Sequence, residues 1–232
     1  MALVKFGAGI IQMLGSVGGT TFARNPCGNY ARARTKPTDP QEPLQMKVRS
    51  SMSFLTSRWS LNLSPEDRTL WNQYAANVVM TNRLGEACYH SGFNHYIRSN
   101  MILKQSDLKL VDPGPAIHQL AAQDDTLSVI ASEIDEEMEV SFNNTMDWAN
   151  ETGAFMVLFQ GIPQNAQRNF FAGPWRLLGH IIGDSLGPPA PTQAFDFVFP
   201  TSAGQRMWIY ARIIRDDGRL SERFRTDCFI DV

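Results

Sequence analysis

The stretch GSVGGTTFARNPCGNYARAR, residues 15–34, predicts a β-hairpin near the start of the chain. In Thr20–Arg24 and Tyr30–Arg34, small or apolar residues alternate with polar ones, as they do in half-buried strands. Pro, Gly and Asn in the intervening Asn25–Asn29 favour a turn. Because an isolated two-stranded hairpin is only marginally stable in water, we expect this one to lie on the helices that follow or on another chain.

The segments on either side of the hairpin are predicted to be extended. Met1–Leu14 is apolar but broken by glycines, which disfavour a free helix, so we expect an arm. Thr35–Pro43 contains three prolines and is predicted to be a semi-rigid spacer. Residues 1–43 therefore form an extended arm with a β-hairpin.

Three helices are predicted in residues 44–112. Apolar residues recur in Leu44–Trp59 at spacings that place them on one helical face. Ser64 followed by Pro65 is a strong helix start, because Ser caps the free N–H groups and Pro fits the first turn. A third helix is expected over Gly92–Gln105, after a serine cap. Three such helices with aromatic faces form a small bundle.

A β-sandwich is predicted for residues 116–232, after a boundary at Val111–Pro115 that is rich in Pro and Gly. Seven short strand-like segments separated by turns favour an antiparallel sandwich. They are Thr126–Ile130, Met138–Phe142, Ala154–Phe159, Trp175–Ile182, Ala194–Phe199, Arg206–Ile214 and Arg223–Ile230. The predicted fold class of the whole chain is α+β.

Composition and charge restrict the classes of partner. The chain has 232 residues and a net charge of −2, which creates no bulk field that demands nucleic acid or membrane. No apolar run is long enough to span a membrane, so we predict no membrane partner. The charges are nevertheless uneven: residues 1–36 carry only basic groups, and residues 110–167 carry only acidic ones. This asymmetry indicates a basic arm and an acidic body.

The three cysteines are odd in number and far apart, which indicates no disulfide framework and favours a reducing compartment. Cys88, His90 and His95 resemble a metal-binding group, but a structural zinc site needs four ligands. The nearest further candidates, Cys27 and His118, are distant in sequence. We therefore interpret the group as residues flanking a helix and predict no metal.

No motif for covalent catalysis or phosphate binding occurs in the sequence. Ser64 is better explained as a helix cap than as a nucleophile, and Asp217-Gly218 as hairpin chemistry than as half of a catalytic acid pair. We predict that the protein is not an enzyme, and that it has no catalytic residues, no cofactor and no small-molecule substrate.

The segment Met207–Ser221 resembles the penultimate strand and tight turn of fibronectin type III and immunoglobulin-like sandwiches. The resemblance implies that Met207, Ile209, Ala211 and Ile213 face the core of such a domain. Because many unrelated functions use this fold, the resemblance alone implies no function.

The first 115 residues or so resemble uncharacterised structural proteins of tailed bacteriophages and prophages. The pieces that carry the resemblance are the hairpin, the Lys36–Gln41 spacer, Trp59 followed by Leu63–Asn72, and Gly92–Arg98. The resemblance implies a role in a virion or its assembly, in contact with other virion proteins, and brings no activity with it.

We predict an interface with neighbouring subunits that contains Phe22, Arg24, Tyr30, Arg32, Arg34, Trp59 and Trp71. The arginines suit an acidic protein surface, such as Asp124–Glu139 of a neighbouring copy, or nucleic-acid phosphates. We favour the protein surface, because the basic stretch is short and the net charge is slightly negative. The expected function is a non-enzymatic, homo-oligomeric virion structural protein assembled in the host cytoplasm; the alternative is a packaging accessory that binds nucleic acid.

Overall fold

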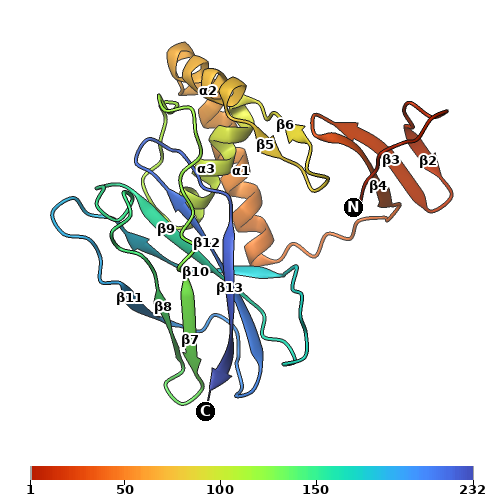
Figure 1. Cartoon of the computed structure of the whole chain (residues 1–232). Helices are drawn as coiled ribbons and strands as arrows, with labels where there is room; N and C mark the ends of the chain where they lie inside the picture. Colours follow the sequence, from red (N-terminus) through yellow and green to blue (C-terminus); the bar gives the residue numbers. More distant parts are fainter. Residues whose placement is uncertain (1, 232) are drawn as a thin grey trace.

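The structure is a computed structural model that describes residues 2–231. The described chain has an α+β fold in three parts: a small N-terminal sheet, three helices and a large β-structure (Figure 1). The helices are α1 (Pro43–Leu61), α2 (Pro65–Asn77) and α3 (Gly92–Gln105). The strands are β1 (Ala2–Leu3), β2 (Gly15–Val17), β3 (Thr20–Asn25), β4 (Gly28–Ala33), β5 (Met80–Thr81), β6 (Ala87–Cys88), β7 (Ser128–Ser132), β8 (Glu137–Ser141), β9 (Phe155–Gly161), β10 (Trp175–Ile182), β11 (Thr192–Asp196), β12 (Arg206–Ile214) and β13 (Phe224–Asp231).

The predicted hairpin is present and is part of a four-stranded antiparallel sheet with the order β1-β4-β3-β2. Its turn is shorter than expected, because Asn25 already pairs with Gly28 and only Pro26 and Cys27 lie between them. Gly28 has a φ of +121°, a backbone conformation that glycine adopts without strain. The predicted arm, Met1–Leu14, is therefore not fully free, since Ala2–Leu3 within it and Gly15–Val17 directly after it add short strands to the hairpin.

The three helices begin where the sequence predicts. The side chain of Ser64 accepts a hydrogen bond from the backbone N–H of Asp67, and the Asp67 carboxylate accepts one from the backbone N–H of Ser64. This reciprocal capping box explains the start of α2. Helix α3 starts with a serine cap but without the reciprocal bond, since Ser91 accepts from the backbone N–H of Asn94 (3.2 Å). The helices pack around an aromatic core in which the rings of Trp71 and Tyr96 meet edge to face.

The seven predicted C-terminal strands are all present, in the order β10-β9-β12-β13-β7-β8-β11. Apolar side chains of β7 and β8 share one core with those of β9, β12 and β13, so the two halves of this sheet pack face to face. Met207, Ile209, Ala211 and Ile213 all lie in that core, as the sequence predicts.

One pairing corrects the prediction of a purely antiparallel sandwich. Strand β13 pairs in parallel with β7, with Ile230 opposite Ala131 and Asp231 opposite Ser132. The last strand thus joins the β12 half of the structure to the β7–β8 half. Alternation in the sequence reports which face of a strand is buried and carries no information about the direction of its partner.

The end of α3 and the segment that follows it pack on the β9–β12 half and share a second core with it. Figure 1 shows the helices at this end of the β-structure. Leu103 of α3 is 0% exposed and lies in one apolar cluster with Val157 of β9 and Ile214 at the end of β12. The predicted boundary is packed as well. Asp112 pairs with Arg58 through two hydrogen bonds of 2.8 and 2.6 Å, and its carbonyl accepts from Trp71 Nε1 (2.8 Å). The segment between the helices and the sandwich is therefore not a free linker.

Candidate functional site

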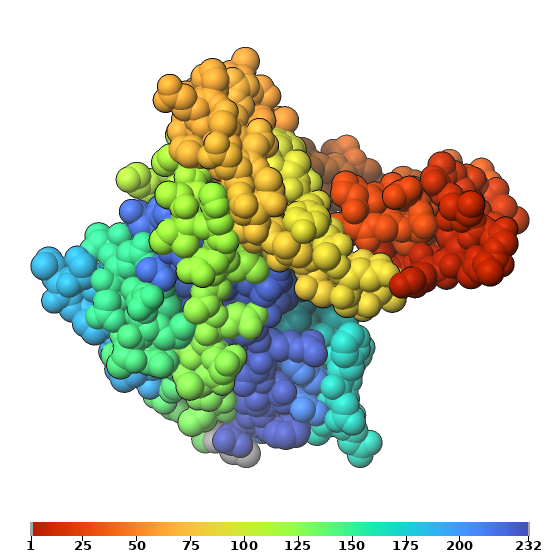
Figure 2. Space-filling view, turned by 45° about the horizontal axis from the view of Figure 1, so that its top comes forward, coloured from red at the N-terminus to blue at the C-terminus, as the bar shows by residue number. Residues whose placement is uncertain are grey.

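The N-terminal sheet projects from the rest of the molecule and meets it at the β5–β6 hairpin (Figures 1 and 2). At this junction Cys27, in the turn between β3 and β4, forms a disulfide with Cys88 of β6, and their Cα atoms are 4.9 Å apart. The prediction of unpaired cysteines is wrong for this pair. The two residues are 61 positions apart, and separation in sequence does not limit proximity in a fold. Cys228 is free, and burial raises the pKa of its thiol to about 12.

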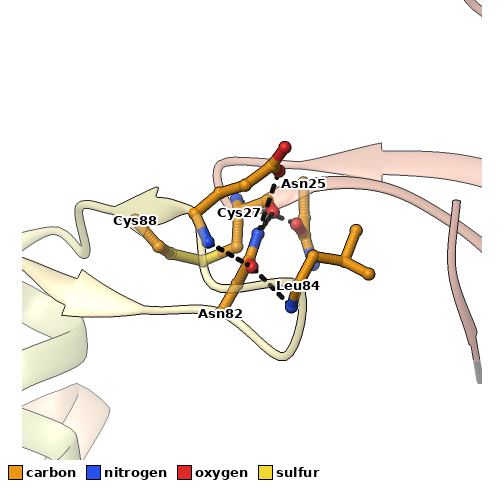
Figure 3. Close-up of a disulfide and its surroundings, with 6 residues drawn as sticks. Asn25, Cys27, Asn82, Leu84 and Cys88 are labelled. Carbon is orange, nitrogen blue, oxygen red and sulfur yellow. Dashed lines mark hydrogen bonds between the residues drawn. A yellow bond between two sulfur atoms is a disulfide. The ribbon is translucent and has the colours of Figure 1, made fainter. Parts of the chain in front are cut away.

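Asn82 fixes the geometry around the disulfide (Figure 3). Its Nδ2 donates to the carbonyl of Cys27 (3.0 Å), which ties β5–β6 to the turn of the N-terminal sheet. Its Oδ1 accepts from the backbone N–H groups of Leu84 (2.8 Å) and Glu86 (3.0 Å), which orders the β5–β6 turn. Across the junction, Asn25 Oδ1 accepts from the N–H of Cys27 (2.9 Å). The cysteines are thus held by two turns that are each stabilised by an Asn side chain.

A salt bridge adds a weaker link between the same two parts. Lys5 Nζ lies 2.7 Å from Glu86 Oε1; the Lys5 side chain is largely exposed and the Glu86 side chain is about half-exposed. Their hydrogen bond raises the pKa of Lys5 and lowers that of Glu86. Exposed pairs of this kind contribute little to stability, so the disulfide and Asn82 are the main attachments of the sheet.

His90 lies beside the two sulfurs. One ligand atom from each of Cys27, Cys88 and His90 lies within 4.8 Å of the others. These residues line one hollow of about 470 Å³ together with Glu222. The structure thus supplies, in Cys27, a ligand that is distant in sequence from the predicted group. His118, the other candidate, is exposed and lies outside this group of close donors.

His95 is buried behind His90. Its side chain is 2% exposed, and its ring lies 5.2 Å from the ring of Tyr74 and 5.8 Å from that of His90, edge-on to both. Burial is the main cause that lowers the pKa of His95 to about 4, with smaller effects of Arg98 and His90. Burial also lowers the pKa of His90. Both imidazoles are therefore neutral at pH 7, the state in which a ring nitrogen can bind a metal or accept a hydrogen bond.

The predicted interface residues on the N-terminal sheet are accessible, but they do not share one face. Arg24, Arg32 and Arg34 are exposed, and Phe22 and Tyr30 are half-buried. Arg24 stands two positions from Phe22 on β3, and Arg32 two positions from Tyr30 on β4. Since Phe22 pairs with Ala31 and Ala23 with Tyr30, these two sets point to opposite faces of the sheet. A flat partner cannot contact Arg24 and Arg32 together.

The two predicted tryptophans belong to the helices and do not form a surface with the arginines. Trp71 is 0% exposed in the helical core, so it has no surface left for another subunit. Trp59 is partly buried, with its ring 5.6 Å from Phe93 and 5.3 Å from Tyr96. Aromatic residues spaced along helices serve the core more often than an interface, and this is their role here.

The acidic stretch predicted to receive the arginines is divided. Asp124 is buried, and its carboxylate accepts from the backbone N–H groups of Thr126 (2.9 Å) and Asn143 (2.8 Å), so it is not available to a partner. Among the other carboxylates, Asp125 precedes β7 and Glu139 lies within β8, and the rest lie in or beside the turn between β7 and β8. Those of Glu133, Asp135, Glu136 and Glu137 line an open hollow of about 790 Å³ together with Asp196.

Comparison with known proteins adds no assignment: no family model matches the chain, and no curated protein matches it. None of the three helices in residues 2–231 combines the length and the apolar character needed to cross a membrane.

Proposed function

We propose that this protein is a non-enzymatic structural subunit of a tailed-phage or prophage-like particle, which docks on neighbouring subunits through its N-terminal sheet. The observation that carries the proposal is the lack of a core in that part of the chain. None of residues 2–50 is buried, although residues 2–33 form a four-stranded sheet. Strands stabilise a sheet by burying one face, so this sheet needs a partner surface that the described chain does not supply.

Exposed apolar side chains in the same region support docking on protein. Ile10, Ile11, Leu14 and Val17 are all exposed, and Ile11 is 96% exposed. The apolar face predicted for Leu44–Trp59 is covered only toward its end, because Leu44, Val48 and Met52 are exposed while Leu55 is buried. Exposed apolar groups that gather in this way mark interaction surfaces.

Charge complementarity favours a second copy of the chain as the neighbour. Arg24, Arg32 and Arg34 form no ion pair with any carboxylate in residues 2–231. The acidic hollow beside the β7–β8 turn presents carboxylates of opposite charge that form no ion pair within residues 2–231, although Glu133 accepts a hydrogen bond from the backbone N–H of Ala203. Arginines on both faces of the sheet suit insertion between two surfaces, as in an arm held between subunits. The contact is heterologous, and repetition of it builds a ring or a tube.

The alternative function is a packaging or assembly accessory that binds nucleic acid through the same arginines. A phosphate backbone is read by a continuous basic surface on one side of a protein. The position of Arg24 and Arg32 on opposite faces disfavours this alternative, because few phosphate contacts are then made at once.

We further propose that the C-terminal part is a domain of the fibronectin type III or immunoglobulin-like class. The strand order supports this identity, because β7, β8 and β11 lie together, as do β9, β12 and β13. Counted from β7, the second strand (β8) neighbours the fifth (β11), and the third (β9) neighbours the sixth (β12). The sheets of immunoglobulin-like sandwiches divide their strands in a similar way. The domain projects from the helices, and the proposed site of assembly is a virion formed in the host cytoplasm.

The triple variant Arg24→Gln, Arg32→Gln, Arg34→Gln tests the proposal. We expect it to remain folded and to lose self-association in native mass spectrometry, because the carboxylates of the neighbour lose their partners at a cost of about 2–5 kcal/mol for each desolvated pair. A matched control, Lys109→Gln, Arg176→Gln, Arg223→Gln, removes the same charge outside the sheet and should associate normally. Salt-sensitive binding of duplex DNA that is lost in the triple variant, with self-association intact, would support the nucleic-acid alternative and contradict the proposal.

A further inference from the structure

We propose that the reduced protein binds one Zn²⁺ ion between Cys27, Cys88, His90 and His95, at the junction of the N-terminal sheet and the helices. This inference goes beyond the proposed function and does not depend on it. It concerns a second state of the two cysteines, in which both are thiols instead of a disulfide.

The positions of three donors carry the inference. The sulfurs of Cys27 and Cys88 and a ring nitrogen of His90 lie within 4.8 Å of one another. Zn–S bonds of about 2.3 Å and Zn–N bonds of about 2.0 Å place neighbouring ligand atoms of a tetrahedral site roughly 3.5–3.8 Å apart. On reduction the two sulfurs would therefore move apart from bonding distance to about 3.8 Å, and the His90 nitrogen would approach them by about 1 Å.

The backbone fixes these donors from two sides. Cys27 occupies the turn between β3 and β4, and Cys88 and His90 are two positions apart in the extended segment that leads into α3. Residues at this spacing in an extended chain point to the same side. Asn82 links the two segments by its bond to the Cys27 carbonyl (3.0 Å). The ligand set is thus held by a turn, a strand end and a helix start.

His95 is the independent observation that points to a ligand. Its Nε2 is buried and has no hydrogen-bond partner. An unsatisfied polar atom in a buried side chain is costly, and it is uncommon without a functional reason. The nitrogens of His95 lie outside the group of donors within 4.8 Å of one another, but its ring lies next to that of His90, 5.8 Å between centroids. We therefore assign His95 as the fourth ligand, which completes a set of two thiolates and two imidazoles of the kind that selects zinc.

The local charges are compatible with a cation. The Arg98 guanidinium is paired with Glu222 (3.2 Å), and Arg83 lines the same hollow as the two cysteines. Two thiolates neutralise the charge of the ion. The hollow of about 470 Å³ beside the two sulfurs gives the ion a path from solvent.

The disulfide and the metal site use the same two sulfurs, so they exclude each other. A dithiol reductant supplies two electrons and two protons to the Cys27–Cys88 bond and becomes a disulfide itself, which leaves two thiols. Binding of Zn²⁺ then releases both thiol protons. Oxidation of the thiolates re-forms the disulfide and frees the ion. In a reducing cytoplasm the metal holds the N-terminal sheet, and in an oxidising medium the disulfide does.

The test uses the full-length protein, treated with a phosphine reductant and mixed with Zn²⁺ or with Co²⁺ as a spectroscopic probe. We expect one Zn²⁺ per reduced chain and none per oxidised chain. We also expect Co²⁺ to give the thiolate charge-transfer and visible d–d bands of a tetrahedral site. Replacing any one ligand, in Cys27→Ser, Cys88→Ser, His90→Gln or His95→Gln, should weaken Zn²⁺ binding by at least about 100-fold. Substitutions of residues that only hydrogen-bond to metal ligands weaken binding by up to about 100-fold, and loss of a ligand itself should cost at least as much. His118→Gln is the matched control, because this histidine is exposed and outside the site.

Reduced wild-type protein that binds no Zn²⁺ and gives no cobalt–thiolate bands would overturn the inference, and this result does not depend on whether any variant folds. Unchanged affinity in Cys27→Ser or His90→Gln would overturn it as well. Unchanged affinity in His95→Gln alone would overturn the four-ligand assignment. Metal content is measured on the unassembled protein, so failure of the zinc site and failure of the assembly function are separate results.

Discussion

Replacing Leu103 by Ala should destabilise the helices and the sandwich together. Leu103 lies on α3, is 0% exposed, and packs in the cluster that joins the helices to β9 and β12. Truncation of the Leu103 side chain to Ala leaves a cavity that is bordered by both the helices and the β-structure. We therefore expect the helical part and the β-structure to unfold in one transition, although the sequence marks a boundary between them at Val111–Pro115.

The magnitude follows from burial. Fully buried Leu→Ala changes cost about 2.7–5 kcal/mol, and Leu103 belongs to this class because none of its surface is exposed. A loss of that size is a large share of the roughly 5–15 kcal/mol that stabilises a typical domain. With a urea dependence of about 2–3 kcal/mol per molar, the unfolding midpoint should fall by about 1–2 M.

Urea unfolding combined with hydrogen exchange and mass spectrometry is the assay. Peptides from α2 (Pro65–Asn77) and β12 (Arg206–Ile214) should lose protection at the same urea concentration, and Leu103→Ala should move both by the same amount. Leu186→Ala is the control, because this leucine is 96% exposed and its loss should leave the midpoint unchanged. Separate transitions, with only the α2 peptides shifted by the substitution, would refute the shared core.

Two further predictions concern the helices and the buried histidine. Ser64→Ala removes the side-chain half of the capping box and should cost about 1 kcal/mol in urea unfolding; an unchanged midpoint would contradict the role of the cap. The pKa of His95 is lowered to about 4 from an ordinary 6.5, so between these values the unfolded chain binds the proton and the folded chain does not. Stability should therefore be complete above pH 6.5 and fall toward pH 4 by up to about 3 kcal/mol, and His95→Gln should flatten this part of the pH profile.

Local signals in the sequence predict much of this fold. Ser64 and Pro65 start α2 through contacts within four residues, and Asn25–Asn29 turns the chain by its own backbone preferences. The core face of β12 follows from simple alternation, which places Met207 and Ile213 inside. Such features are predictable because their physical causes lie in neighbouring residues.

Contacts between distant segments could not be predicted in this way. Cys27 and Cys88 meet because the fold brings two separate turns together, and nothing in the sequence around either cysteine predicts that it pairs with the other. The exposure of Arg24 and Arg32 follows from their charge, but their positions on opposite faces of the sheet depend on the register between β3 and β4. Asp124 has the sequence signature of an exposed acid, but the backbone N–H groups around it bury it as a structural acceptor.

The most direct test of the central claim is native mass spectrometry of the full-length protein and of a truncated protein that lacks residues 1–36 and carries Cys88→Ser. The truncated protein keeps every buried residue of the helical and sandwich cores except Cys88, which becomes Ser, so we expect it to stay folded, with its helix and β-strand signals intact in circular dichroism. The account predicts oligomers for the full-length protein and monomers for the truncated one at equal concentration. A truncated protein that assembles like the full-length chain, or a full-length monomer whose N-terminal sheet is already protected from hydrogen exchange, would contradict it.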